Sequence, residues 1–502
     1  MLSKTKSTAN GQPSDEVASG NENKILIIII LGTLMGALDT TIVLLALPTL
    51  TSELHANLSI SLWVILMYLL VTAVTTTQFG RIGDMFGRGK IFNTGFVVFT
   101  IGSALCGFSP SIGYLIGFRA LQAIGGSLMQ ANSGAIIADT FEAHRRGKAF
   151  GFSSIGWNMG SMLGIVLGGF ITTFIGWRYI FYINIPIGIV ATAFGLKYVR
   201  DEKKTNAKMD LIGMLFLTSA LILVSYGAID ITGTGFDAFN LSLIATGLML
   251  GVVFLLVEKK VAHPMLVLSA FKNRVLTFSI FASFFQSVGY LAVAFILIMY
   301  LQGVRGMNPF SASLLLIPGY IISSMTSPFM GRLSDKYGAR IIATLGILLM
   351  ICTIVIYTTL TPTTNLYLIV LASVISGIGA SMFWPANSSA IMSNADPAHY
   401  GSISGLSRLT GNIGTLSSFV LSITVASLAI PRNVAFQIFL GSSALIGNIS
   451  TEFMHGIHTT FFVSIVLLAI AALMSLIRGK EDRTRIHEQH TASVKSVSES
   501  TK

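Results

Sequence analysis

The sequence predicts an all-α membrane protein in which two six-helix bundles are joined by two additional transmembrane helices. Of its 502 residues, 53% are hydrophobic and only 11% are charged, and the mean hydropathy is +0.76. Soluble domains do not have this composition. An internal repeat is the other main observation, because it relates the first six apolar segments of the chain to the last six.

Fourteen apolar segments are each long enough to cross a bilayer. A spanning helix needs about 20 predominantly apolar residues, because in hydrocarbon its backbone amides must bond to one another. The first segment follows a polar stretch and is too long for a signal peptide, so we expect it to stay as a helix. Hydropathy places the segments at residues 25–50, 59–79, 91–109, 112–137, 147–174, 179–199, 209–229, 238–258, 277–302, 311–330, 341–359, 366–390, 402–427 and 457–477.

Basic residues gather on one side of the membrane that these helices would cross. The two tails and the alternate loops on their side hold 27 of the 32 Lys and Arg residues, and the opposite loops hold three. This positive-inside asymmetry predicts that both termini lie in the cytoplasm, as in a multi-pass protein of the plasma membrane. The net charge of +11 therefore reflects topology and contact with anionic lipids, and we expect no nucleic-acid binding.

The chain accordingly divides into five parts. Residues 1–24 and 479–502 are polar tails that we expect to be disordered. Residues 25–200 and 261–478 form the two six-helix bundles, and residues 201–260 hold the two additional helices. No loop is long enough for an appended catalytic domain. Cys106 and Cys352 lie in different halves without metal-type spacing, so we interpret them as small packing residues and expect no metal site.

Two pairs of matching segments carry the repeat. The loop 80–88 (GRIGDMFGR) recurs as 331–340 (GRLSDKYGAR) at an offset of 251 residues, and 147–161 matches 401–415 at an offset of 254. Helices one to six therefore correspond to helices nine to fourteen, while helices seven and eight stand outside the repeat. Transporters are often built from such halves, with the solute site between them.

The repeated loops follow the pattern G-x-[IL]-[GS]-D-x-x-G. Glycines allow a tight reversal, and the Asp can cap the N-terminus of a neighbouring helix. We expect the two loops to latch the bundles together as a cytoplasmic gate, in which Arg408 either pairs with Asp84 or snorkels toward water. The expected gate residues are Gly80, Asp84, Gly87, Arg88, Gly331, Asp335, Gly338, Arg340 and Arg408. This loop pattern resembles the hallmark of the major facilitator superfamily, although Met85 stands where that family has a basic residue.

Asp39 and Arg119 lie inside the first and fourth predicted helices. A charged carboxylate in the membrane needs a partner or water, so it is a functional candidate. Because these helices run in opposite directions, the two side chains can lie at similar depth and pair. We expect the pair to handle a proton or a cation, since its charge state depends on burial and on the neighbouring cation. The alternative is an inert pair that fixes helix packing.

Three segments resemble the fourteen-helix drug:proton antiporters (DHA2-like multidrug exporters) of that superfamily. Residues 38–48 (LDTTIVLLALP) resemble the first-helix motif, with Leu44 in place of an Asn, and residues 119–126 (RALQAIGG) resemble R-x-x-Q-G-x-G. The run 177–188 (WRYIFYINIPIG) strengthens this resemblance. Ile165 replaces the proline of the family's antiporter motif, which leaves the direction of transport open. The packing glycines of that motif correspond here to Gly156, Gly160, Gly164, Gly168 and Gly169, whose spacing allows close approach of a facing helix.

Polar and aromatic residues inside the helices are candidates for a solute cavity between the bundles. Such residues are also compatible with packing or lipid contact. The candidates are Gln122, Trp157, Asn158, Gln286, Tyr290, Trp384 and Asn412.

The resemblance implies a proton-coupled exporter of small amphipathic, often cationic compounds, which works by alternating access as a monomer. The chain has no P-loop, nucleophile elbow, zincin motif or paired-Cys redox site, so we expect no enzyme and no cofactor, only a proton gradient as the energy source. A single intramembrane carboxylate predicts exchange of one proton. Two alternatives stay open: an importer or symporter of a nutrient or organic anion, with Arg119 and Arg408 on the anion, and a non-transporting membrane sensor.

Overall fold

A computed structural model describes residues 14–141, 143–199, 209–261, 264, 271–394, 400–428 and 449–479. Every regular element in these ranges is helical, and thirteen helical segments are long and apolar enough to cross a membrane. The other predicted segment, 112–137, forms the 29-residue helix α4 (Ile112–Thr140). Polar side chains such as Arg119, Gln122 and Asn132 make α4 less apolar than the others.

The first bundle contains six predicted segments, the sixth of which is divided between two helices. Within it, α1 packs on α5 and α7, α3 packs on α4 and α7, and α2 packs on α4. Helix α1 begins at Ser14, so residues 14–24, which we expected in the disordered tail, are helical. The helices are α1 (Ser14–Glu53), α2 (Leu58–Phe86), α3 (Arg88–Phe108), α4, α5 (Ala143–Phe174), α6 (Tyr179–Tyr182) and α7 (Asn184–Tyr198).

The second bundle repeats this packing. Its α10 packs on α15 and α17, α13 packs on α14 and α17, and α12 packs on α14. Each pair corresponds to a pair of the first bundle, so the internal repeat of the sequence is also a repeat of the structure. The helices are α10 (Arg274–Tyr290), α11 (Val293–Met299), the π-helical η2 (Tyr300–Val304), α12 (Pro309–Tyr337), α13 (Ala339–Tyr357), α14 (Leu366–Ser393), α15 (Tyr400–Leu428) and α17 (Ile449–Ile477).

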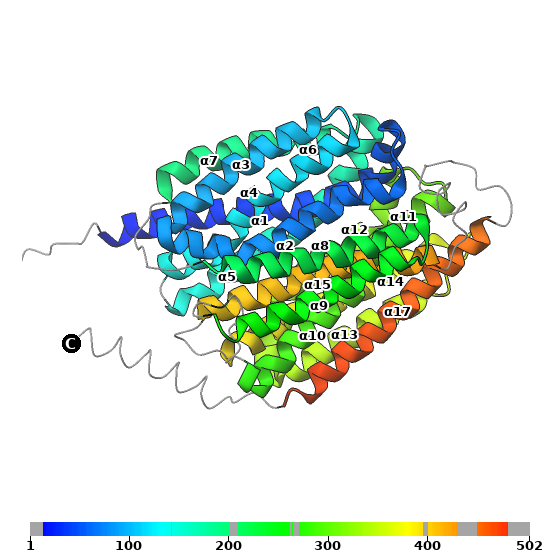
Figure 1. Cartoon of the computed structure of the whole chain (residues 1–502). Helices are drawn as coiled ribbons and strands as arrows, with labels where there is room; N and C mark the ends of the chain where they lie inside the picture. Colours follow the sequence, from blue (N-terminus) through cyan, green and yellow to red (C-terminus); the bar gives the residue numbers. More distant parts are fainter. Residues whose placement is uncertain are drawn as a thin grey trace, which may run out of the picture.

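Helices α8 (Leu211–Thr234) and α9 (Ala238–Glu258) pack on each other, and α8 also contacts α2 and α15. Helix α8 therefore lies along the seam between the two bundles (Figure 1). Helix α9 exposes large apolar side chains, among them Leu248, Met249 and Val252, as a helix facing lipid would. Both helices stand outside the repeat, in agreement with the sequence.

The bundles contact each other at both ends. We call the end that holds Ser14 and Ile477 the termini side, and the opposite end the far side (Figure 1). On the far side, the backbone N–H of Phe310 in α12 donates to Thr173 Oγ1 of α5 at 3.2 Å. On the termini side, α15 donates to Gln130 of α4: Arg408 Nη1 lies 2.6 Å from its carbonyl oxygen and Asn412 Nδ2 lies 3.4 Å from Oε1.

The two repeated loops have the same backbone conformation. Gly87 and Gly338 have φ values of 112° and 97°, a region that residues with a side chain rarely adopt. Each glycine N–H bonds to a carbonyl four residues earlier, which ends α2 and α12. Gly80 faces α4 and Gly331 faces α14, so these positions also correspond. Both reversals therefore require their glycine, as the loop pattern predicts.

Asp84 does not cap the helix that follows its loop, α3. Arg88 Nε donates to Asp84 Oδ1 at 2.7 Å, and Arg88 Nη1 donates to Asp139 Oδ2 at 2.6 Å. Because Asp84 lies in the last turn of α2, before the reversal, it meets Arg88 four residues later. Helix α3 begins at Arg88, and its N-cap residue Gly87 provides no side-chain cap. Both ion pairs of Arg88 stay within the first bundle. Arg340 lies partly exposed at the start of α13, and the side chain of Asp335 lies outside the described side chains.

Candidate functional site

Asp39 lies in the interior of the first bundle, with 0% of its surface exposed. Arg119 of α4 is 1% exposed, and its Nη1 lies 2.6 Å from Asp39 Oδ2. The structure therefore brings together the two ionisable residues that we expected to pair. Removing a charge from water costs several kcal/mol, so each group is tolerable here because the other compensates it.

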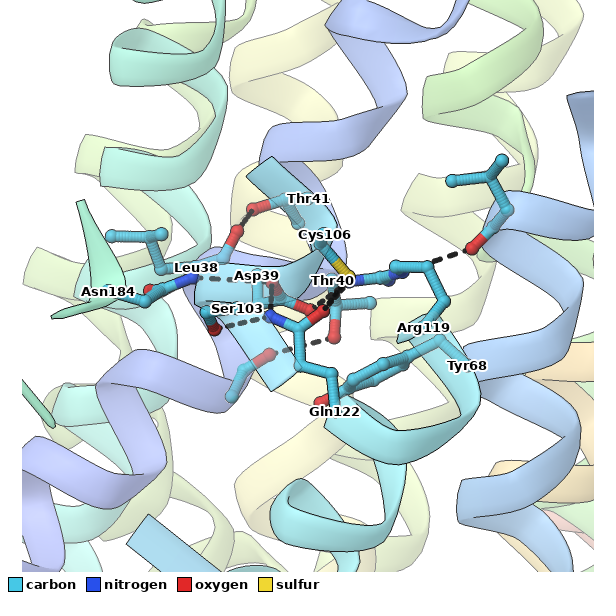
Figure 2. Close-up of polar contacts among 12 residues, drawn as sticks. Leu38, Asp39, Thr40, Thr41, Tyr68, Ser103, Cys106, Arg119, Gln122 and Asn184 are labelled. Atoms are coloured by element: carbon cyan, nitrogen blue, oxygen red, sulfur yellow. Dashed lines mark hydrogen bonds and ion pairs between the residues drawn. The ribbon is translucent and has the colours of Figure 1, made fainter. Parts of the chain in front are cut away.

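Gln122 joins the two charged side chains. Its Nε2 donates to Asp39 Oδ1 at 2.7 Å and to Ser103 Oγ of α3 at 2.8 Å, and its Oε1 accepts from Arg119 Nη1 at 2.7 Å. Residues three apart lie on the same face of a helix, which explains how Gln122 and Arg119 reach one carboxylate. Gln122 was predicted to line a solute cavity, and the structure places it in this buried network (Figure 2).

Arg119 also has neutral partners. Its Nε donates to the carbonyl oxygen of Val64 in α2 at 3.1 Å. Its guanidinium carbon lies 4.4 Å from the ring centre of Tyr68, within the range of a cation–π contact. The guanidinium therefore retains several contacts even without the charge of Asp39.

Asn184 completes the site from α7. It is the first residue of that helix, it is 0% exposed, and its Nδ2 lies 3.4 Å from Asp39 Oδ1. Figure 2 shows it reaching Asp39 from the side away from Arg119. Sequence reasoning gave no role to Asn184, Ser103 or Tyr68. A polar residue within the run 177–188 was a signal for Asn184, whereas serine and tyrosine are too common in membrane helices to stand out.

The glycines of α5 hold α1 in place beside this site. Small residues four apart form a ridge that lets two helix backbones come close. The facing helix is α1, and Gly169 on the next face of α5 meets Pro309 and Phe310 of α12 instead. A Cβ on Gly156, Gly160, Gly164 or Gly168 would lie 3.2, 2.5, 2.6 or 2.8 Å from the carbonyl oxygens of Ile30, Leu34, Leu38 and Ile42, respectively.

The other predicted cavity residues do not gather at one place. Gln286 is fully buried and donates to Met350 Sδ of α13, and Tyr290 bonds to Ser376 of α14, so both lie within the second bundle. Trp384 is 38% exposed on α14. On α5, Trp157 is exposed and Asn158 is half-buried, whereas Asn412 contacts Gln130 at the bundle interface.

Arg408 does not pair with Asp84, contrary to one of our two expectations. Its guanidinium donates to the carbonyl oxygen of Gln130, while Asp84 accepts from Arg88. Arg408 lies well inside α15 and faces α4, whereas Asp84 lies at the end of α2, so the backbone of α4 is the acceptor within reach. Arg408 still joins the two bundles on the termini side, through α4 instead of the repeated loop.

A mostly apolar cavity of about 510 Å³ lies between α2 and α8. The rings of Trp63 and Tyr226 stand 6.3 Å apart at its far-side end. Thr75 and Thr218 contribute the hydroxyl groups of its lining, and the remaining side chains are apolar. The cavity therefore adjoins an additional helix and the first bundle, not the Asp39 site.

Known proteins resemble this chain along most of its length. Residues 29–418 match the family described as the Major Facilitator Superfamily. The chain is 33% identical to the riboflavin transporter RibZ of Clostridioides difficile, over 80% of this chain and 89% of that protein. It is 29% identical to the multidrug transporter protein MdtP of Bacillus subtilis, over 79% of this chain and 74% of that protein.

Two further similarities extend this picture. The tetracenomycin C resistance and export protein of Streptomyces glaucescens is 28% identical over 80% of this chain and 76% of that protein. Among solved structures, a bacterial homologue of the human lysosomal transporter Spinster covers 93% of this chain and 98% of that chain, with a TM-score of 0.65 and 17% identity. At this identity the likeness shows the fold alone.

Proposed function

The chain belongs to the Major Facilitator Superfamily, and we propose that it is a proton-coupled exporter of small amphipathic, often cationic compounds. Family membership makes the protein a multi-pass membrane transporter and not an enzyme. Export is the direction in the printed name of the tetracenomycin relative, and multidrug transport is the function in that of MdtP. These names support the substrate class that the motifs imply.

The buried pair of Asp39 and Arg119 is the observation that carries the proposal. A proton on Asp39 would remove its charge and weaken the ion pair, which would leave Arg119 as a buried cation. The cost is limited because Gln122 Oε1 and the carbonyl oxygen of Val64 already accept from the guanidinium, and Tyr68 lies against it. This site can therefore exist with Asp39 charged or neutral, which a proton carrier requires.

A cationic solute would compete with Arg119 for the carboxylate. Its arrival from the cytoplasm would favour release of the proton from Asp39, and a proton from outside would later displace it. Because the glycine ridge binds α1 to α5 backbone to backbone, a change at Asp39 would move both helices as a unit. Helix α5 also meets α12 near Gly169 on the far side, so the same unit reaches one of the contacts that must open.

Alternating access would open the two ends in turn. The contact of Arg408 and Asn412 with Gln130 would close the termini side, which the charge bias predicts to be cytoplasmic. Phe310 against Thr173 would close the far side. One proton entering down one pH unit supplies roughly 1.4 kcal/mol. A membrane potential of about 100 mV adds roughly 2.3 kcal/mol only when the exported compound is neutral, because exchange of one proton for one monovalent cation moves no net charge.

Everted membrane vesicles with an acidified lumen test this proposal. Addition of a lipophilic cation such as ethidium should release protons from vesicles that contain the wild-type chain, and Asp39→Asn should abolish the release. Asp237→Asn is the matched control, because Asp237 caps the start of α9 away from the site. Ethidium transport without proton movement, or wild-type proton release by Asp39→Asn, would contradict the assignment.

A second candidate is riboflavin transport, favoured by the 33% identity to RibZ over most of both chains. Uptake of labelled riboflavin into intact cells that lack their own riboflavin transporter separates the two functions. Uptake that depends on this chain, combined with no change in resistance to cationic drugs, would favour an importer. The direction of transport has to be tested because Ile165, which is fully buried, stands where the antiporter motif has a proline.

A further inference from the structure

Asn184 has a buried acceptor atom without a partner. The residue is 0% exposed, and its Oδ1 makes no hydrogen bond in the described structure, while its Nδ2 faces Asp39. Buried polar atoms are nearly always bonded, because leaving one unpaired costs free energy. An exception that points its amide at a buried carboxylate therefore needs an explanation.

The bonds around Asp39 show where a proton could be held. Oδ2 is engaged by Arg119 at 2.6 Å, and Oδ1 accepts from Gln122 at 2.7 Å and only distantly from Asn184 at 3.4 Å. A bond of 3.4 Å lies at the limit of a useful N–H···O contact. The lone pair of Oδ1 that faces Asn184 is therefore the most weakly hydrogen-bonded position described on the carboxylate.

A protonated Asp39 needs an acceptor for its O–H group. Arg119 can only donate, and Gln122 Oε1 already accepts from Arg119. Tyr68 lies with its ring against Arg119, and the Cys106 thiol donates to Gln122 Oε1 at 3.6 Å. Asn184 Oδ1 lies beside Asp39 as a buried acceptor that makes no hydrogen bond in the described structure.

We propose that Asn184 is the positioning residue for the proton of Asp39. A half-turn of its amide about the Cβ–Cγ bond exchanges Nδ2 for Oδ1 and keeps the side chain in the same space. The proton adds to Asp39 Oδ1, no covalent bond breaks, and the new O–H donates to Asn184 Oδ1. The amide thus donates to the charged carboxylate and accepts from the neutral acid. This assignment rests on the proposed role of Asp39 in proton coupling and names the group that stabilises its protonated form.

Infrared difference spectroscopy of the full-length protein in liposomes tests this assignment with the proton itself as the probe. The carboxylic acid C=O band that Asp39→Asn lacks reports protonation of Asp39 as the pH is varied. Asn184→Leu keeps the side-chain shape without hydrogen-bonding atoms. The substitution removes a strong hydrogen bond from protonated Asp39 and only a weak one from its carboxylate form. We therefore expect the midpoint of Asp39 protonation to move about one pH unit toward acid, a tenfold loss of proton affinity.

A matched control is Asn93→Leu. Asn93 of α3 is another buried asparagine with an unpartnered Oδ1, and it faces Gly195 of α7 instead of Asp39. We expect it to change stability without changing the midpoint. If Asn184→Leu does not accumulate, Asn184→Ala removes the same acceptor without added bulk.

The possible outcomes are distinct. If the wild type shows the Asp39 band and Asn184→Leu or Asn184→Ala leaves its frequency and its protonation midpoint unchanged, the role of Asn184 alone is overturned. The same acid shift in Asn93→Leu would also overturn it, because the effect would then reflect general packing. If the wild type shows no band that depends on Asp39, the proposed proton carrier itself is wrong.

Discussion

Gly164→Ala perturbs the closest helix contact beside Asp39. Gly164 of α5 faces α1 at Leu38, the residue before Asp39, and Thr41 Oγ1 bonds across this contact to the carbonyl oxygen of Ser161 at 3.1 Å. An added Cβ would lie 2.6 Å from Leu38 O and 2.0 Å from Thr41 Oγ1. The threonine can rotate away, but the backbone oxygen cannot.

The size of the effect follows from that backbone contact. Ordinary Cβ contacts begin at 3.4 Å, so α1 and α5 must separate by roughly 0.8 Å, the difference between 2.6 and 3.4 Å. Overpacking of this kind costs about 1–3 kcal/mol, and loss of the Thr41 hydrogen bond adds about 1 kcal/mol. We therefore expect Gly164→Ala to lose about 2–3 kcal/mol, even though alanine favours a helix more than glycine does.

Thermal unfolding of the full-length protein in detergent, followed by loss of the monomer peak on a sizing column, measures this effect. Gly36→Ala is the matched control, because Gly36 lies on α1 with no atom within 4 Å of its added Cβ. It should unfold at or slightly above the wild-type temperature, since a glycine inside a helix costs about 0.5–1 kcal/mol relative to alanine. Equal unfolding temperatures for the two variants would refute the close α1–α5 contact.

Three further outcomes are expected. Arg119→Ala should lower the free energy of unfolding by about 3–5 kcal/mol, because it leaves the buried Asp39 carboxylate without its cation. In thermal unfolding, the double variant with Asp39→Asn should recover most of this loss. Purely additive losses would argue against a direct pair. Arg408→Gln should weaken the contact with Gln130 and speed alkylation, from the termini side, of a cysteine placed between the bundles; unchanged labelling would mean that other contacts close this end. Gly338→Ala should lower stability by about 1–2 kcal/mol because its φ is 97°, and an unchanged unfolding temperature would show that the loop relaxes.

Hydropathy predicted the helices because the bilayer constrains each segment separately. Every segment must satisfy its own backbone in hydrocarbon, so length and apolar content suffice to find it. The boundaries are less accurate, because polar residues can continue a helix beyond the hydrocarbon. Helix α1 begins at Ser14 and not at 25, and α17 begins at Ile449 and not at 457. The packed helix pairs of the two bundles correspond because the two halves of the sequence correspond segment by segment.

The site was predictable only in part. Asp39 and Arg119 stand out in the sequence because charges inside membrane segments are rare and need each other. Asn184 and Ser103 do not stand out, because their roles depend on how α7 and α3 are rotated around α1. Gln122 was recognised as a polar residue in a helix, but its position in the ion pair became visible only with the distances.

The sequence by itself determined the helical class, the six-plus-two-plus-six arrangement, the glycine ridge and the buried charge pair of Asp39 and Arg119. These features are periodic or local, so each can be inferred from residues on one or two helices. Only the tertiary structure decided that the ridge meets α1, that Arg408 meets Gln130 and that the predicted cavity residues are dispersed. Such contacts depend on the lateral order and rotation of packed helices, which arise from many side chains at once.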